Sequence, residues 1–369
     1  MKLALVVRGG VDRSGEYRVI PVLLALIERL SRAHDVHVFA LVQEPAAARW
    51  KLAGATIHNI GRGRTHVRSI AAIRAEHRRA PFDLVHAVFA GPCGLIAVAA
   101  AKLLRLPNMV HYTSGELVAL RDIGYGGQLN WKGRLSERIT LRCANVVTAT
   151  SAPIIDELQA FGVRAQRVPL GVDLRKWPPL APHPRHQGPA RLIHIASLNR
   201  VKDQPTLLHA LARLAKTGID FEMDIVGVDT LQGEMQELLH RLDLHRRVRF
   251  LGFKTQRELR PVMESADVLV MSSRHEAGPA VLLEAAVAGV PTVGTAVGHI
   301  VEWAPSAALA VPVGNPERLA DAIHTLLADE ALRLRVARAA QCRALSEDAD
   351  YTARTFEAHY QRLTAGARG

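Results

Sequence analysis

The segment 265–302 constrains the fold most, because its residue pattern predicts a complete strand–helix–strand unit. Residues 266–271 form an apolar, β-branched run of buried-strand length, and a polar turn with glycine follows. The next stretch, 279–289, has helical character, with proline at its start and glycine at its end. A short strand begins at Thr292. This order predicts a βαβ unit and therefore a parallel sheet.

Two carboxylates flank the loop of this unit. In βαβ units the carboxyl end of a strand and the amino end of the next helix form a crevice that favours anions. Glu276 lies in the loop, and Glu284 follows a little over two helical turns later, so both side chains can reach the crevice. A chain with this many acids also shows such a pair by chance, so the spacing alone assigns no function.

The length of 369 residues predicts two domains, and the low aromatic content of 5% with abundant Ala, Val and Leu predicts an α/β protein. The longest apolar run, 87–101, is shorter than the roughly 20 residues of a membrane-spanning helix, and the amino terminus predicts a strand rather than a signal peptide. Three cysteines lie far apart without metal or redox spacing. We therefore expect a reduced, cytoplasmic protein.

The positive charge is confined to the first half of the chain. Residues 1–176 contain 25 Lys and Arg against 13 Asp and Glu, which accounts for the whole formal net charge of +12. The densest basic run is 62–79, where Ile70 and Ile73 lie three apart, so an amphipathic basic helix and an ordinary solvated helix both fit. An anionic membrane, an anionic acceptor or nucleic acid could meet such a surface.

The loop and helix of the 265–302 unit resemble a known family of enzymes. The polar loop with Glu276, the sequence LLEAAVAGVP and the glycine before His299 resemble, in this order, the retaining nucleotide-sugar glycosyltransferases of glycosyltransferase family 4. The resemblance implies the GT-B fold, with two Rossmann-like domains facing across a cleft and a C-terminal helix crossing back to the first. We expect an acceptor-binding domain at 1–177, a donor-binding domain at 178–350 and the returning helix at 351–369.

The resemblance implies a donor site in the second domain. The family places an arginine and, five residues later, a lysine on the donor diphosphate; here Ser197 stands at the arginine position, Lys202 matches the lysine, and Arg200 is a candidate for the missing cation. Glu284 is assigned to the ribose and Glu276 to the sugar hydroxyls and the developing oxocarbenium ion. The other donor-binding residues are Gly227, Phe253, Lys254, Ala277, Gly278, Pro279, Ala280 and Val281.

On the acceptor side the resemblance implies a role for Ser14 and Gly15 in the first turn and for Gly115 with Ser114 after a later strand. The family often has a His-Gly pair there. This chain departs from it, and His111 is the nearest histidine, a candidate catalytic residue or a core histidine. An Asp-x-Asp at 348–350 lies in the closing helical region, and no metal or other cofactor is expected.

The resemblance implies transfer of a sugar from a UDP- or GDP-type donor to a glycan, a lipid-linked precursor or a small molecule, with retained configuration and without metal. The alternatives are a nucleotide-sugar epimerase of the same architecture and a basic nucleic-acid-binding protein. Nucleic-acid binding would explain the charge but not the 265–302 unit, so no nucleic-acid partner is expected. An anionic membrane on the cytoplasmic side is a candidate partner, and the sequence does not indicate an oligomeric state.

Overall fold

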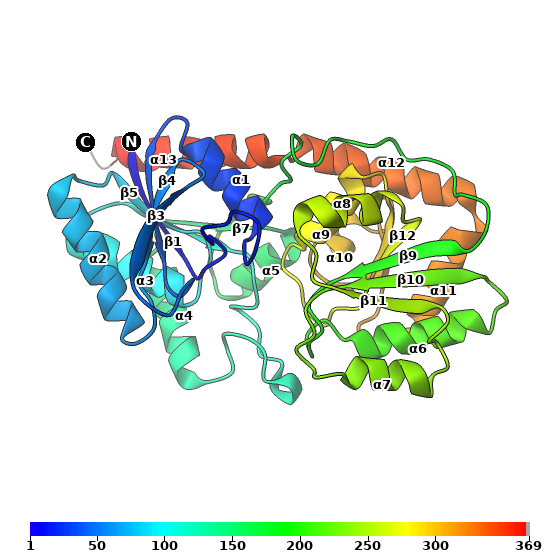
Figure 1. The fold of residues 1–369 in the computed structure, drawn as a ribbon. Coiled ribbons are helices and arrows are strands. Elements are labelled where there is room, and N and C mark those ends of the chain that lie inside the picture. Colours follow the sequence, from blue (N-terminus) through cyan, green and yellow to red (C-terminus); the bar gives the residue numbers. More distant parts are fainter. Residues whose placement is uncertain (367–369) are drawn as a thin grey trace. The chain divides into compact units, whose positions relative to one another are not determined.

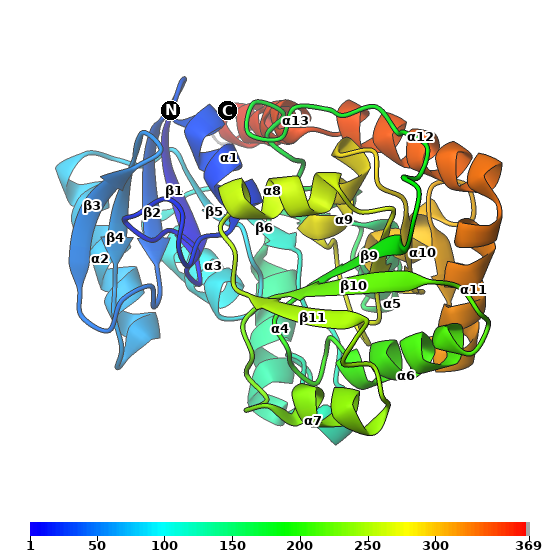
Figure 2. The ribbon, with the colours of Figure 1, turned by 45° about the vertical axis from the view of Figure 1, so that its right-hand side comes forward.

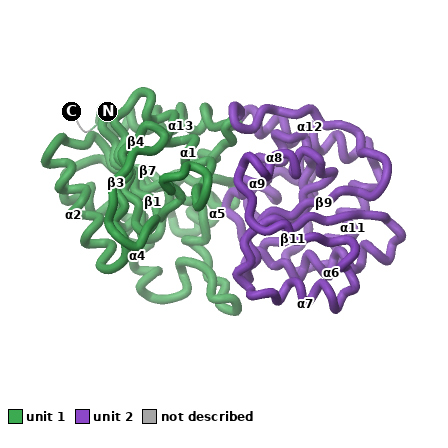
Figure 3. The backbone as a smooth tube through the Cα atoms, in the orientation of Figure 1, with its two compact units in different colours: residues 1–173, 347–369 green, residues 174–346 purple. Residues whose placement is uncertain are grey.

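The computed structural model describes residues 1–366 and divides the chain into two compact units (Figure 3). Unit 1 contains residues 1–173 and the C-terminal segment that begins at Glu347, and unit 2 contains residues 174–346. The division falls a few residues before each boundary expected from the sequence. Each unit is an α/β structure around one sheet (Figure 1).

Unit 1 has an eight-stranded sheet in the order β3-β4-β2-β1-β5-β6-β7-β8, parallel except for the antiparallel pair β3–β4. β1 is buried along its whole length, as its apolar sequence predicts for a strand with helices on both faces. The strands are β1 Lys2–Val7, β2 Asp35–Ala40, β3 Ala48–Leu52, β4 Ala55–Asn59, β5 Leu84–Ala87, β6 Asn108–Tyr112, β7 Val146–Ala149 and β8 Gln166–Arg167. The helices are α1 Pro21–Leu30, α2 Thr65–Arg79, α3 Pro92–Leu104, α4 Trp131–Cys143, α5 Ala152–Ala160 and α13 Ala349–Gly366, with a short 3-10 helix, η1, at Arg121–Ile123.

The C-terminal helix α13 belongs to unit 1, where it packs against α1. The buried Arg29 of α1 holds it there, because its guanidinium pairs with Asp350 at 2.5 Å and with Asp173 at 3.0 Å. Asp348 accepts a hydrogen bond from the backbone N–H of Tyr351 in the first turn of the helix. Both acids of the Asp-x-Asp sequence therefore have structural partners.

Unit 2 has a six-stranded, fully parallel sheet in the order β11-β10-β9-β12-β13-β14. Figure 2 shows β9, β10 and β11 side by side. Its core packs apolar side chains of the strands against α6 and α11. The strands are β9 Ala190–Ile195, β10 Phe221–Val226, β11 Val248–Gly252, β12 Val268–Met271, β13 Thr292–Thr295 and β14 Leu309–Val311. The helices are α6 Gln204–Ala215, α7 Glu234–Arg241, α8 Gln256–Glu264, α9 Ala280–Val287, α10 Gly298–Trp303, α11 Pro316–Ala328 and α12 Glu330–Ser346.

Each sheet reverses its strand order at one place. In unit 2 the chain runs outward from β9 through β10 to β11 and then returns to the other side of β9 with β12. In unit 1 the same reversal lies between β1 and β5. Open α/β sheets bind ligands beyond the carboxyl ends of the strands at such a switch point. The loops after β9, β12, β1 and β5 are therefore where functional side chains are expected.

The structure differs from the sequence expectations in three places. The apolar tract 17–30 has helical periodicity in the sequence, but the helix begins only at Pro21. Before it the chain bends at Arg18, whose φ is +50°, and Val19 and Ile20 pair back to Val11 and Gly10. The antiparallel hairpin β3–β4 was not predicted. The basic run forms α2, whose Ile73 is buried where the helix packs on α3, so its exposed face is charged rather than apolar. Within residues 1–366, no helix has both the length and the apolar content to cross a bilayer.

Candidate active site

The switch point of unit 2 brings a lysine and a glutamate together. Lys202 follows β9 and Glu276 follows β12, and their Nζ and Oε1 atoms are 2.5 Å apart. Both side chains are largely shielded, with 25% of Lys202 and 10% of Glu276 exposed. Ser273 donates a second hydrogen bond to the same carboxylate oxygen at 2.6 Å. A cation and a carboxylate thus share the place where a parallel sheet binds ligands.

The two loops are tied to each other and to the neighbouring strand. Ser272 donates from Oγ to the carbonyl oxygen of Lys202 at 2.8 Å, and the N–H of Arg274 donates to Val201 at 2.7 Å. Thr295, at the end of β13, donates to the carbonyl oxygen of Ser273 at 2.5 Å. Because buried hydrogen bonds fix both loops, the charged pair is pre-organised rather than formed by two mobile surface chains.

Gln204, the first residue of α6, holds the loop that carries Lys202 in place through its side-chain amide. Its amide nitrogen lies 3.2 Å from the carbonyl oxygen of Ser197 and 3.2 Å from Nε2 of His194. Burial lowers the pKa of His194 to about 4, so it is neutral at pH 7. Asp203 adopts a left-handed conformation and caps α6 through Thr206, which turns the chain sharply just after Lys202.

Glu284 lies on the second turn of α9 and is buried. Burial raises the pKa of this carboxyl to about 7, and a hydrogen bond of 2.9 Å from the amide of Gln256 opposes the shift. The indole of Trp177 donates to the other end of Gln256. Sequence reasoning missed Gln256, although the capping pair Thr255 and Glu258 marks the start of α8 at this residue.

Two glycines let backbone segments approach each other at this edge of the sheet. A Cβ on Gly227, whose φ is +155°, would lie 1.9 Å from the carbonyl oxygen of Ala196. A Cβ on Gly298, whose φ is +50°, would lie 2.8 Å from the carbonyl oxygen of Ala277 and 2.9 Å from that of Glu276. Gly298 therefore allows the start of α10 to pack directly against the backbone of the loop that carries Glu276.

The other predicted donor residues surround the same strand ends. The exposed Ser197 follows β9, and Phe253, 49% exposed, follows β11 with the half-buried Lys254. Arg200 pairs with Glu234 of α7 at 2.7 Å, and both side chains are about half exposed. The backbone of Ala277, Gly278, Pro279, Ala280 and Val281 leads into α9, and Pro279, the N-cap residue of that helix, forms no side-chain cap hydrogen bond. Helix N–H groups without a side-chain cap favour a bound anion.

In unit 1 the predicted turn after β1 is an ordered loop. Gln43, which sequence reasoning missed, accepts hydrogen bonds from the N–H groups of Gly10 and Val11 at 2.7 and 3.1 Å. Ser14 is exposed and donates to Asp12 at 3.0 Å, and Gly15 has a φ of +70°. Although burial opposes ionisation, hydrogen bonds from Ser14 and the nearby Arg18 lower the pKa of Asp12.

Ser114 and Gly115, the predicted acceptor-side residues after β6, lie next to the buried Glu116. The N–H of the exposed Ser114 donates to Oε2 of Glu116 at 2.8 Å, and burial raises the pKa of Glu116 to about 7. A Cβ on Gly115 would lie 2.5 Å from the ring of Tyr125. Gly115 therefore lets the 120–127 loop fold back over this strand end, which gives the residue a packing role.

His111 belongs to the core of unit 1 rather than to a substrate-facing surface. It has no exposed surface, and its Nδ1 lies 2.9 Å from the hydroxyl of Thr148. Its ring meets that of Phe356 on α13 edge to face, with centroids 5.3 Å apart. Burial lowers the pKa of His111 to about 3. This burial between β6 and α13 favours the core-histidine alternative, and a catalytic role for His111 stays a prediction.

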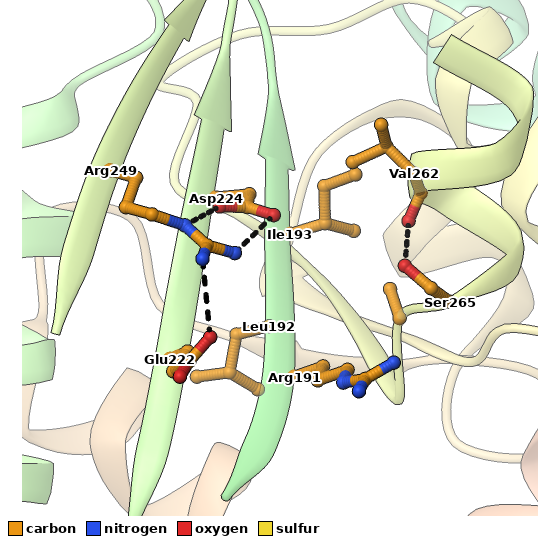
Figure 4. Close-up of a pocket in the computed structure, with 9 residues that line it drawn as sticks. Arg191, Leu192, Ile193, Glu222, Asp224, Arg249, Val262 and Ser265 are labelled. Atoms are coloured by element: carbon orange, nitrogen blue, oxygen red, sulfur yellow. Dashed lines mark hydrogen bonds and ion pairs between the residues drawn. The ribbon is translucent and has the colours of Figure 1, made fainter. Parts of the chain in front are cut away.

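A further hollow in unit 2, drawn in Figure 4, lies at the amino-terminal half of the strands. Lys202 and Glu276 follow the opposite, carboxyl ends of β9 and β12. Arg249 of β11 spans the hollow and pairs with Asp224 at 2.8 Å and Glu222 at 3.5 Å (Figure 4). The charges of Arg249, Asp224 and Glu222 are already paired with one another, and ligands of parallel sheets bind at the opposite strand ends. This hollow is therefore not the candidate active site.

One group of side chains within residues 1–366 has the spacing of a metal site. Ligand atoms of His37, His58 and Glu76 lie within 4.8 Å of one another. The Glu76 carboxylate is already paired with the ammonium of Lys2 at 3.2 Å, which opposes binding of a second cation. Lys2 and His37 lie near the amino ends of β1 and β2, so the group is away from the strand ends that form the switch point of unit 1.

Family models match both units. The model of glycosyl transferases group 1 matches residues 180–343, and the model of the glycosyl transferase 4-like domain matches residues 19–171. The chain belongs to this family of glycosyltransferases. The resemblance noted for the sequence is thereby confirmed, and the matches place the candidate site in the group 1 region.

Relatives found by sequence agree with the family. The chain is 30% identical over 281 residues to a glycogen synthase of Mycobacterium tuberculosis and 29% identical over 245 residues to the putative glycosyltransferase EpsF of Bacillus subtilis. These alignments cover 73% and 62% of this chain and 66% and 61% of the relatives, which is just under two thirds of either relative's length.

The sucrose-phosphate synthase of Thermosynechococcus elongatus has the same fold as this glycosyltransferase, with a TM-score of 0.83 at 20% identity and 99% of each chain covered. Anabaena Alr3699/HepE, solved in complex with UDP-glucose, has a TM-score of 0.75 at 19% identity, with 98% of this chain and 100% of that chain covered. The expected GT-B fold class is confirmed.

Proposed function

We propose that this glycosyltransferase moves a sugar from a UDP- or GDP-type donor to an acceptor with retained anomeric configuration. The observation that carries the proposal is the Lys202–Glu276 pair, held at 2.5 Å at the switch point of the unit 2 sheet. The UDP-glucose complex of Anabaena Alr3699/HepE supports a nucleotide-sugar donor. The acceptor proposed here is a glycan, a lipid-linked precursor or a small molecule.

The charges of Lys202 and Glu276 are opposite to the charges that develop at the two ends of the breaking bond between sugar and diphosphate. As the anomeric carbon separates from the diphosphate oxygen, negative charge grows on the diphosphate and positive charge on the sugar ring. The Lys202 ammonium and the amino end of α9 stabilise the first charge, and the Glu276 carboxylate stabilises the second. Glu276 need not act as a covalent nucleophile in this scheme.

The remaining donor contacts follow from the positions around these strand ends. Glu284 accepts from the ribose hydroxyls, the backbone at Phe253 and Lys254 meets the edge of the base, and Gly227 leaves room for the nucleotide. The backbone of 277–281 and Ser197 contact the phosphates and the sugar. Arg200 must leave Glu234 before it can contribute, and this exposed pair is worth only about 0–1 kcal/mol, so its release costs little.

The acceptor contacts are proposed for unit 1. Ser14 and Ser114 are exposed in loops after β1 and β6, and Gly15 and Gly115 give those loops their shape. No metal is proposed for the reaction, because Lys202 and the α9 helix end supply positive charge for the diphosphate. His111 supports β6 from within the core in this scheme.

Turnover with a series of UDP- and GDP-sugars tests the proposal. Release of the nucleoside diphosphate identifies the donor, and proton NMR of the new glycosidic bond reports its configuration. The expected result is release from at least one donor and a product with the donor's anomeric configuration. An inverted product would contradict the retaining mechanism. If no nucleotide sugar is bound or hydrolysed while RNA or DNA binds with a steep salt dependence, the proposal fails as a whole.

A further inference from the structure

The exposed face of α4 carries an apolar stripe. Trp131, Leu135 and Ile139 are 62%, 47% and 41% exposed. They follow one another at intervals of four residues, so they lie along one side of the helix. Glu137 and Thr140, on the other side, are buried where the helix packs against α3 in unit 1 (Figure 1). The helix therefore has one face in the core and one apolar face in water.

The same helix is positively charged on its surface. Its exposed cations are Lys132, Arg134, Arg138 and Arg142. None of them forms an ion pair with a carboxylate within residues 1–366; Lys132 lies over the Trp131 ring at 5.8 Å, and Arg134 donates to the carbonyl oxygen of Gln128 at 3.1 Å. The acid of the helix, Glu137, is buried and accepts from the hydroxyl of Tyr112. The outer surface of α4 is thus apolar and cationic without compensating negative charge.

The basic helix α2 lacks this combination. Its exposed arginines, among them Arg68, Arg74 and Arg78, carry charge, but its Ile73 is buried and Val67 is its single large apolar side chain exposed in the described structure. A helix with this distribution of exposed side chains can attract an anionic surface but has no apolar face to insert into it. The membrane contact expected from the 62–79 run therefore suits α4 better than α2.

We propose that α4 docks unit 1 on an anionic lipid bilayer. Trp131, Leu135 and Ile139 enter the boundary between head groups and acyl chains, and the flanking cations contact the anionic head groups. The apolar side chains complement the acyl-chain boundary, and the unpaired positive charges that border them complement the anionic head groups. A second copy of this basic helix would instead bring like charges together. Resting on the proposed function, this docking brings the unit with the acceptor loops to a lipid-linked acceptor.

Vesicle flotation tests the docking face with two matched variants. One variant replaces Arg134, Arg138 and Arg142 of α4 with Gln, and the other replaces Arg68, Arg74 and Arg78 of α2 with Gln, so that both lose three positive charges. At low salt the wild type is expected to float with phosphatidylglycerol vesicles and not with phosphatidylcholine vesicles. The α4 variant is expected to lose about tenfold or more in vesicle affinity, and the α2 variant about threefold or less.

A third variant, Trp131→Ser with Leu135→Ser and Ile139→Ser, tests insertion, because it keeps every charge and is expected to lose flotation as well. Trp131→Phe provides a spectroscopic reading: wild-type fluorescence should shift to the blue with anionic vesicles, and this shift should disappear in the variant. Failure of the wild type to float, equal losses in the two arginine variants, or self-association through α4 without vesicle binding would overturn the proposal. Donor hydrolysis measured without vesicles should be unchanged in all variants, so the membrane proposal can fail separately from the proposed function.

Discussion

Replacing Glu284 with Gln should remove a pH dependence from the stability of unit 2. The carboxyl of Glu284 is buried, and burial raises its pKa from 4.5 to about 7 in the folded chain. A carboxyl whose folded pKa lies above its unfolded pKa stabilises the fold at low pH, and this contribution is lost as pH rises from 4.5 through 7. At 1.36 kcal/mol for each pKa unit, the loss amounts to about 3 kcal/mol between pH 4.5 and pH 8.

Glutamine is close in shape to the protonated carboxyl and can still meet the amide of Gln256. At pH 5 the free energy of unfolding of the variant should therefore be similar to that of the wild type. At pH 8 the variant should be more stable by up to about 3 kcal/mol, because it has no buried charge to form. The difference between the two proteins at each pH isolates Glu284 from the buried acids Glu116 and Glu137, whose pKa values burial also raises to about 7.

Urea unfolding at a series of pH values, followed by tryptophan fluorescence, measures this difference. Trp177 is a local reporter, because its indole bonds to the same Gln256 that contacts Glu284. Replacing the exposed Glu237 of α7 with Gln is the matched control, because it removes a carboxyl from the surface of unit 2 rather than from its interior. A difference between Glu284→Gln and wild type that stays constant from pH 5 to pH 8 would refute the assignment of a strongly raised pKa to Glu284.

Two further outcomes are expected from the same structure. Activity should survive EDTA, because Lys202 and the amino end of α9 supply the positive charge at the diphosphate; complete loss in EDTA with rescue by Mn²⁺ or Mg²⁺ would contradict this. His111→Leu should lower the free energy of unfolding by about 1–3 kcal/mol, because the buried Thr148 hydroxyl loses its partner, while kcat of the folded enzyme stays within a few fold; a kcat loss of several hundredfold in folded protein would place His111 in the chemistry.

The sequence predicted the local order of unit 2 well because apolar runs, glycines and prolines determine it directly. The strand at 266–271, the helix within 279–289 and the strand that begins at Thr292 follow from such patterns, as does the amino-terminal strand of unit 1. Even the position of Glu276 beyond the carboxyl end of a strand was predictable, because parallel strands always present their carboxyl ends at one edge of the sheet. The order of strands and helices along the sequence was therefore sufficient to predict the fold class.

The side-chain partners were not predictable in the same way. Nothing in the local sequence shows that Gln43 holds the loop after β1, that Gln256 reaches Glu284, or that Arg200 pairs with Glu234. These contacts join residues from different elements and depend on how the strands are ordered. His111 illustrates the limit: its position near the end of a strand suggested function, but the face of β6 on which it lies packs under α13.

The most direct test of the account is the donor kcat/KM of Lys202→Ala. Lys202 and Glu276 are joined at 2.5 Å at the switch point, and loss of one placed charge-stabilising group should cost about 2–4 kcal/mol of transition-state stabilisation, or roughly 30- to 1000-fold in kcat/KM. Arg200→Ala, two residues away and paired with the exposed Glu234, is the matched control and should cost much less. An unchanged kcat/KM for Lys202→Ala with an active donor would remove Lys202 from the site and contradict the central claim.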